Sequence, residues 1–231
     1  MVLGLLSLAT TVPLLATSAI NLQDSAQKHQ NGSKSTSSDQ NNDWKTDKCH
    51  LRARCTKRMN ESRKTALDRQ PIVLRDGGFY ISSPKTRDRE HPFTGYSLPF
   101  PEKDYLGLVS TISDDPPMLN WIYIDRETYG VRYGVRKVAE TQLVGPFDYK
   151  VTQGMTIVRS AEKTERQGGE KRIKFRNLEG FVAVEEEEGV WKLYFDVDND
   201  GLKQVEAGKS GKRNAEVELL RVSLEESDSD S

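Results

Sequence analysis

Three aspartates at alternate positions, followed by a glycine, form the most specific candidate site in the sequence. Asp196, Asp198 and Asp200 precede Gly201, and several carboxylates on one tight turn are ligands that suit Ca²⁺. An EF-hand loop needs a glutamate at its twelfth position, which is Ala207 here. The pattern therefore leaves two interpretations open. It predicts a calcium-dependent binding module, with calcium as the one cofactor to consider, or a structural turn closed by aspartate side chains.

Acid–base and nucleophilic catalysis have few candidate residues. Of the three histidines, His29 and His50 fall in segments expected outside the core, which leaves His91. Asp114 and Asp115 form a carboxylate pair, but no GxSxG motif nominates a serine nucleophile. A non-enzymatic binding module is the main interpretation, and a small hydrolytic enzyme that uses Asp114, Asp115 or His91 is the alternative.

Aromatic side chains beside two loops are candidates for a binding surface. Strict alternation places Trp121 on one face of the segment 118–124, and that face is either core or a ligand platform. The partner, a protein or a small ligand, is not specified by any motif. The predicted ligand-binding residues are Asp114, Asp115, Asn120, Trp121, Phe147 and Tyr149.

The segment 106–135 would position most of these residues. Two apolar runs, 106–112 and 118–124, flank a breaker that contains Pro116 and Pro117, and a third run covers 129–135. Short runs of β-branched and aromatic residues between turns are typical of consecutive antiparallel strands. Prolines cannot donate to a strand ladder, so they belong between the first two strands.

Similar short runs continue through residues 70–224. An Asp-Gly turn separates 72–74 from 79–81, four glutamates separate 180–184 from 190–195, and the last run covers 215–224. We find no internal repeat in the sequence. The pattern predicts a mainly β fold, a single antiparallel β-barrel or sandwich of about ten short strands.

Composition limits the class of partner. The 231 residues carry 34 basic and 35 acidic side chains, a formal net charge of −1. No global positive field favours nucleic acid, so we expect none as a partner. The hydrophobic fraction of 35% is low for a chain that is globular throughout. Part of the chain should therefore lie outside the core.

Three parts of the chain are expected outside the core: the two ends and the region after the N-terminal segment. Residues 1–22 carry no charged side chain and are interpreted as a signal peptide, a membrane anchor or a buried helix. Residues 23–69, polar at first and then basic, are predicted to be a disordered linker, and residues 225–231 an acidic disordered tail. The domain is expected to be secreted or membrane-anchored through residues 1–22, although a cytoplasmic location stays open.

The only two cysteines, Cys49 and Cys55, lie in the expected linker. In the secretory pathway they could close a small disulfide loop, whereas in the cytosol they would be free thiols.

Several stretches together carry a family resemblance. These are Met1-Val2-Leu3-Gly4 and residues 91–96, 107–117, 119–123, 143–148, 179–185 and 194–202. With them the chain resembles a family of filamentous-fungal proteins that has no established activity. The resemblance implies a fungal source and no catalytic residue. The family usually has tryptophan where this chain has Phe147, which counts against a shared aromatic binding site.

Overall fold

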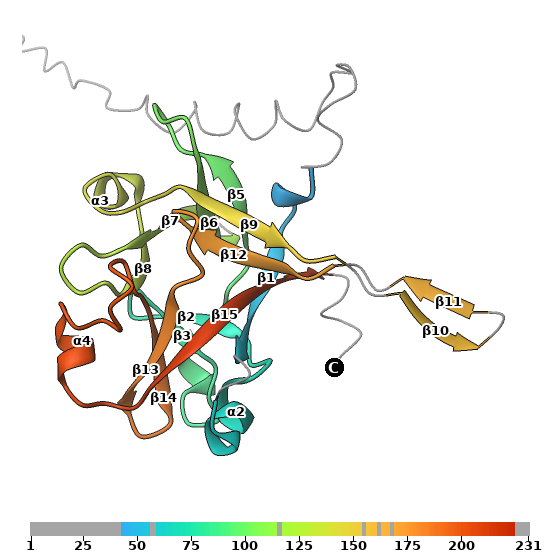
Figure 1. Cartoon of the computed structure of the whole chain (residues 1–231). Coiled ribbons are helices and arrows are strands. Elements are labelled where there is room, and N and C mark those ends of the chain that lie inside the picture. The colour runs from blue at the N-terminus through green and yellow to red at the C-terminus, as the bar shows by residue number, and fades with distance from the viewer. Residues whose placement is uncertain are drawn as a thin grey trace, which may run out of the picture. The chain divides into compact units, whose positions relative to one another are not determined.

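Antiparallel strands joined by a few short helices form the domain (Figure 1). The computed structural model describes residues 43–55, 59–114, 117–153, 156–160, 163–166 and 169–224. One sheet contains thirteen of the strands, and β10 and β11 pair with each other in a second sheet. In chain order the elements are η1 (Asp43–Lys45), β1 (Cys49–Cys55), α2 (Glu61–Leu67), β2 (Ile72–Arg75), β3 (Gly78–Ile81), η2 (Arg87–Arg89), β4 (His91–Pro92), β5 (Gly95–Pro99), β6 (Leu106–Asp114), β7 (Pro117–Ile124), β8 (Val131–Gly134), α3 (Arg136–Ala139), β9 (Phe147–Val151), β10 (Thr156–Ser160), β11 (Lys163–Arg166), β12 (Lys171–Phe175), β13 (Phe181–Glu187), β14 (Val190–Phe195), α4 (Glu206–Lys209) and β15 (Asn214–Ser223).

Strand pairing divides the domain into three units of similar plan. The second and third strands of each unit form a hairpin, in the pairs β2–β3, β7–β8 and β13–β14. The last strand of each unit pairs with the first strand of the next, in the pairs β5–β6, β9–β12 and β15–β1. The structure thus repeats three times although the sequence shows no repeat, because pairing needs a pattern of apolar positions and not identical residues.

The pairing of β1 with β15 closes the sheet. The two strands run antiparallel from Cys49 opposite Ser223 to Cys55 opposite Val217. The main sheet then passes from β1 through β5, β6, β7, β8, β3, β14, β13 and β15 back to β1. The predicted mainly β fold is confirmed, and this closure makes it a barrel, which leaves none of these strands with an open edge.

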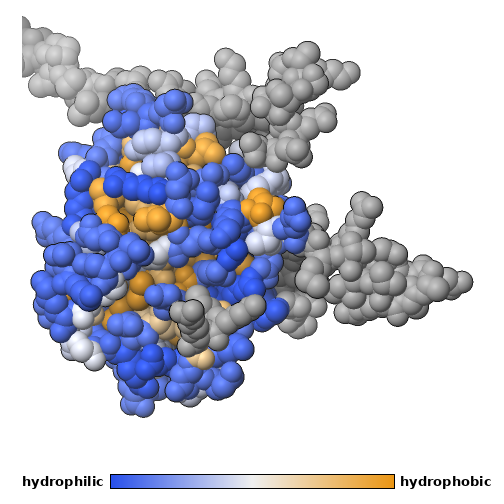
Figure 2. All heavy atoms as spheres, viewed as in Figure 1, coloured by the Kyte–Doolittle hydropathy of each residue, from blue (hydrophilic) through white to orange (hydrophobic). Residues whose placement is uncertain are grey.

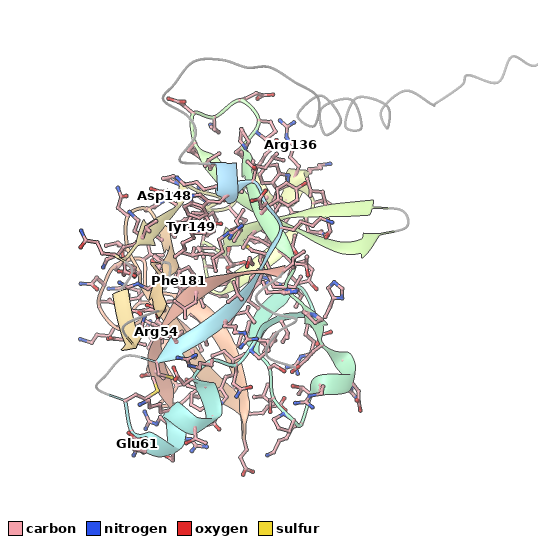
Figure 3. The ribbon with its side chains drawn as sticks, turned by 90° about the vertical axis from the view of Figure 1, so that its right-hand side faces the viewer. Arg54, Glu61, Arg136, Asp148, Tyr149 and Phe181 are labelled. Carbon is pink, nitrogen blue, oxygen red and sulfur yellow. The ribbon has the colours of Figure 1, made fainter. Side chains whose placement is uncertain are left out.

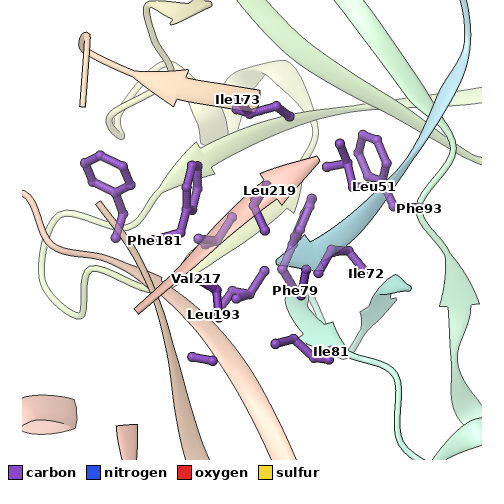
Figure 4. Close-up of a cluster of buried hydrophobic side chains, with 14 of the residues drawn as sticks. Leu51, Ile72, Phe79, Ile81, Phe93, Ile173, Phe181, Leu193, Val217 and Leu219 are labelled. Carbon is purple, nitrogen blue, oxygen red and sulfur yellow. The ribbon is translucent and has the colours of Figure 1, made fainter. Parts of the chain in front are cut away.

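Apolar side chains from all three units fill the interior (Figure 4). Phe175 packs edge-on against Phe147 and Phe195, with ring centroids 5.0 and 5.1 Å apart. Phe181 packs on Phe195 in the same way at 5.0 Å. These edge-to-face contacts join β9, β12, β13 and β14 into one core.

The predicted linker over residues 23–69 is wrong for residues 49–55 and 59–69. Cys49, Leu51, Ala53 and Cys55 alternate with outward-facing residues along β1 and are buried, and Leu67 of α2 is buried as well. The outward-facing side chains of β1 are basic, and for that reason the segment was interpreted as a linker. Arg54, which projects from β1 (Figure 3), lies 3.7 Å from a carboxylate oxygen of Glu218 on β15. The basic charge therefore belongs to a strand face and not to a linker.

A disulfide between Cys49 and Cys55 is also excluded by this strand. The two residues stand at opposite ends of β1, six residues apart. At about 3.3 Å per residue the separation is roughly 20 Å, whereas a disulfide needs Cα atoms within about 7 Å. Both thiols are free and buried, and burial raises the pKa of each to about 11.

The other expectations about the chain ends concern residues outside the described ranges. Residues 1–22, the polar part of the predicted linker before residue 43 and the acidic tail at 225–231 all lie there. Among the residues that the structure describes, no helix is long and apolar enough to cross a membrane. Residues 42–231 form one compact unit, which contains every described element.

Candidate ligand-binding pocket

A cavity of about 340 Å³ opens between four connecting segments of the barrel. They are the β5–β6 loop, the β7–β8 turn, the α3–β9 loop and the β12–β13 turn. β9 and β12 lie side by side, so the loop that enters β9 and the turn that leaves β12 meet at the same end (Figure 1). The volume is in the range of small-molecule sites. The lining residues are Phe100, Pro101, Glu102, Lys103, Tyr105, Arg126, Glu140, Gln142, Val144, Gly145 and Arg176.

Aromatic rings form one wall of the pocket. Phe100 is buried and meets the buried Trp121 edge-on, with ring centroids 4.7 Å apart. Tyr105 stacks on Phe100 at 6.1 Å with an interplanar angle of 19°. A Cβ atom at Gly145 would lie 2.5 Å from the Tyr105 ring. The ring can therefore take this position only because residue 145 has no side chain.

Three cationic residues line the pocket, and none of them has a carboxylate partner among the described residues. Arg126 Nε donates to the carbonyl of Thr141 at 2.9 Å, and Arg176 Nε donates to the carbonyl of Gly145 at 3.4 Å. A carbonyl group that accepts a hydrogen bond from a guanidinium fixes its orientation but does not neutralise its positive charge. Among the described side chains, no carboxylate lies within ion-pair distance of Lys103, Arg126 or Arg176.

The two acidic residues of the pocket share one cation. Arg136 of α3 contacts Glu140 through Nε at 2.5 Å and Glu102 through Nη2 at 3.3 Å. Arg136 therefore compensates acidic charge from both sides of the opening. Together with Arg136, the charged lining residues leave a net positive site.

On the face in Figure 2, hydrophilic residues cover most of the surface and apolar residues appear in separate small areas between them. Recognition on that face therefore depends on charge and hydrogen bonding as well as on apolar contact.

The side chains predicted to form an aromatic ligand platform lie in the core, which is the other interpretation that the sequence left open for the Trp121 face. Asn120, Trp121, Phe147 and Tyr149 are all buried. Trp121 lies behind Phe100 of the pocket wall. Asp148 and Tyr149 are neighbours on β9 (Figure 3). Alternation along the strands shows which residues share a face, but it does not show which face is buried.

Tyr149 illustrates how a polar aromatic residue is accommodated in this core. Its hydroxyl lies 3.2 Å from Ser97 Oγ, and Trp44 meets its ring edge-on at 5.0 Å. Burial raises the pKa of Tyr149 to about 12.

Of the two predicted acidic ligand-binding residues, Asp114 ends β6 and Asp115 lies outside the described residues.

The three aspartates after β14 direct their oxygens mainly at neighbouring backbone amides. Asp196 accepts from the amides of Asp200 and Gly201 at 3.1 and 2.8 Å. Asp200 accepts from the amide of Lys203 at 2.9 Å, and Asp198 accepts from the Tyr129 hydroxyl at 2.8 Å. Within the described residues, no three His, Cys, Asp or Glu side chains are grouped to hold a metal ion. This geometry favours the structural turn, and calcium binding stays a prediction.

The residues of the hydrolase alternative lie on separate parts of the sheet. His91 is exposed on β4, which pairs with β2, whereas Asp114 lies on β6, which pairs with β5 and β7. The strand pairings of the described residues therefore give the alternative no support.

The cations of the pocket were not among the residues predicted to bind a ligand. Lys103, Arg126 and Arg176 are far apart in the chain, and each lies in a different connection between strands. The one signal in the sequence is that each of these residues follows a strand within a few positions. That signal does not say which connections meet in space.

Comparison with known proteins agrees with the three-unit barrel. A model of the fungal beta-trefoil domain matches residues 20–225. Comparisons with curated proteins and with solved structures find no match. The match supports the resemblance to a fungal protein family that the sequence motifs indicated, and the threefold plan of hairpins is what a trefoil requires. The chain belongs to the fungal beta-trefoil domain family.

Proposed function

We propose that this domain is a non-enzymatic binding module whose pocket takes a small ligand with an anionic group, such as a carboxylate, sulfate or phosphate. The observation that carries the proposal is the set of three cations, Lys103, Arg126 and Arg176, that line a cavity of about 340 Å³. Exposed cations that line a cavity and have no carboxylate partner among the described residues favour a ligand that supplies the opposite charge.

The pocket offers separate contacts for two parts of such a ligand. A guanidinium presents several N–H donors in one plane and matches a carboxylate or phosphate with two parallel hydrogen bonds. Arg126 and Arg176 each use Nε on a backbone carbonyl, and Arg126 also donates from Nη2 to the carbonyl of Gln142 at 3.5 Å, so the remaining terminal nitrogens are the donors for the anionic group. The ring of Tyr105, supported by Phe100, is the surface for an apolar or planar part.

A paired panel of small ligands tests the proposal. Each acid is compared with its neutral amide or ester, and the melting temperature of the full chain is measured at low salt. We expect acids to raise the melting temperature and their neutral partners to leave it unchanged, because a ligand that binds only the folded state stabilises it. Salt should weaken the effect. Equal stabilisation by the acids and their neutral partners would refute the anionic site.

A further inference from the structure

A second group of cations lies where the three hairpins meet, and none of its residues lines the pocket. Lys192 of β14 stands opposite Tyr80 of β3, and Arg132 of β8 stands opposite Gly78 of β3. The residues that flank Lys192 on β14 are buried, and those that flank Arg132 on β8 are buried or half-buried, whereas the two cationic side chains are partly exposed. Both cations therefore face outward. The buried neighbours are Phe79, Ile81, Val131, Trp191 and Leu193.

Glycines provide a flat base beneath these cations. A Cβ atom at Gly78 would lie 3.4 Å from Cε of Lys192, and one at Gly130 would lie 3.9 Å from the same atom. A Cβ atom at Gly77 would lie 3.6 Å from Arg132 Nη2. The two cationic side chains therefore rest close to bare backbone, which leaves the space above them free of side chains from residues 77, 78 and 130.

Lys192 has no hydrogen bond or ion pair with any described residue. Its Nζ lies 5.5 Å from the centre of the Tyr194 ring. Partial burial lowers the pKa of Lys192 against the opposing effect of Glu186, and the charge of Arg132 lowers it further. Glu186 itself is bound by the Tyr194 hydroxyl and by Lys212.

The neighbouring cations have only incomplete compensation. Arg132 lies 3.8 Å from Asp125, whose carboxylate also accepts from the amides of Glu127 and Thr128. Arg75 stacks its guanidinium 4.1 Å from the centre of the Tyr80 ring, and its Nε is buried without a hydrogen-bond partner. Arg75 Nε also lies 3.6 Å from a carboxylate oxygen of Asp76. Of the three cations, Lys192 is therefore the one without an ion pair to a described carboxylate, and Glu186 and Asp125 act on it only from beyond ion-pair distance.

We propose that the surface around Lys192 and Arg132, called the hub below, is a second binding site. It is specific for a tetrahedral oxyanion, a phosphate or sulfate group, which these two residues hold. An ammonium donates up to three hydrogen bonds and a guanidinium donates from a planar fork, so both can contact different oxygens of one tetrahedral group. A bound oxyanion would supply Lys192 with the partner that the described residues do not provide.

The test is a titration of the full chain followed through the Cε resonance of Lys192 in ¹³C-labelled protein. Inorganic phosphate and sulfate are each compared with chloride at equal ionic strength. Glycerol 3-phosphate is added as a phosphate monoester, to distinguish a free ion from an esterified group. We expect saturable shifts with phosphate and sulfate. A response equal to that of chloride would overturn the proposal.

Variants identify the residues and separate this site from the pocket. Lys192→Gln and Arg132→Gln should each weaken phosphate binding about tenfold, the loss of one charge-assisted contact. Binding to the Lys192→Gln variant is followed through the Tyr80 ring resonances, because this variant lacks the Lys192 signal. The exposed Lys203→Gln is the matched control and should leave the affinity unchanged. The Arg126→Gln/Arg176→Gln double variant should also bind phosphate at the hub normally. Wild-type affinity in a folded Lys192→Gln variant, checked by circular dichroism, would contradict the assignment.

Discussion

At the scale of single residues, turn geometry depends on aspartates that accept backbone hydrogen bonds. Asp125 begins the β7–β8 turn and accepts from the amides of Glu127 and Thr128 at 3.1 and 2.9 Å, and from the Thr128 hydroxyl at 2.9 Å. Partial burial acts to raise the pKa of Asp125, but the bonds from Thr128 and Glu127 and the charge of Arg132 outweigh it, so that its pKa lies below the ordinary value.

This shift predicts a pH-dependent contribution to stability. A lowered pKa in the folded state stabilises the protein above the unfolded value of about 3.9, and the stabilisation is lost as the pH falls through the folded pKa. We expect Asp125→Asn to lower the free energy of unfolding by about 1–2 kcal/mol at pH 7 and by less near pH 3. Urea unfolding at both pH values measures this. The exposed Asp76→Asn is the control, and an equal loss at both pH values would refute the linkage.

Gly145 has a specific steric role at the pocket wall. Its missing side chain lets the Tyr105 ring cover the pocket wall, where a Cβ atom would be 2.5 Å away. We expect Gly145→Ala to displace Tyr105, weaken ligand binding and destabilise the domain by about 1–3 kcal/mol, as overpacking does. Gly134→Ala, whose Cβ atom would lie 3.5 Å from Tyr123, is the control. Unchanged tyrosine fluorescence and ligand affinity in Gly145→Ala would contradict this role.

At the scale of elements, β1 is the strand that the barrel needs and that sequence reasoning missed. Its pairing with β15 closes the sheet, and the segment before it is attached by Trp44. The ring of Trp44 lies 4.2 Å from Lys171 Nζ and 5.3 Å from the guanidinium carbon of Arg221. Arg221 also donates to the carbonyl of Trp44 at 2.6 Å.

These contacts predict a graded response to truncation. A chain that starts at Asn42 should keep the wild-type melting temperature, because it retains β1 and Trp44. A chain that starts at Lys48 should melt several degrees lower, since it loses the Trp44 contacts. A chain that starts after Cys55 should not fold, because β15 would lose its pairing with β1, which closes the barrel. Circular dichroism and thermal melts distinguish the three, and normal folding of the shortest chain would show that β1 is dispensable.

The elements found correctly from sequence share one property. The hairpins β2–β3, β7–β8 and β13–β14 combine short apolar runs with a turn signal, so local information is enough to predict them. β1 lacks that combination, because Cys and Ala supply three of its four inward positions and Arg and His alternate with them. Composition indicated a linker there, and only the long-range partner β15 shows that it is a strand.

At the scale of the whole molecule, the mainly β fold followed from the sequence but the pocket did not. The pocket requires Lys103, Arg126 and Arg176 to converge from three connections, and that convergence depends on which strands pair across the barrel. The residues that were expected to bind, such as Trp121 and Phe147, lie one layer behind the pocket or in the core. Their aromatic character indicated burial rather than recognition.

The location of the molecule depends on residues 1–22, for which we propose delivery to the secretory pathway or a membrane. Expression of the full chain in a filamentous fungus, with identification of the mature N-terminal residue and the cell fraction, tests this. We expect either a new N-terminus near Ile20 with protein in the medium, or an intact Met1 in the membrane fraction. An intact chain in the cytosol would refute both. Cys49 and Cys55 should stay free thiols in any compartment, because β1 holds them apart.

The central claim is that the pocket binds anionic ligands through arginines that have no carboxylate partner within the described part of the chain. Its most direct test is isothermal titration calorimetry with the strongest acidic ligand of the paired panel. The wild type, the Arg126→Gln/Arg176→Gln variant and the Lys137→Gln control on α3 are titrated in parallel. We predict that the double variant loses at least about 3 kcal/mol of binding free energy, the worth of two charge-assisted contacts, and that the control binds as the wild type. Wild-type affinity in the double variant would show that the pocket is not the binding site.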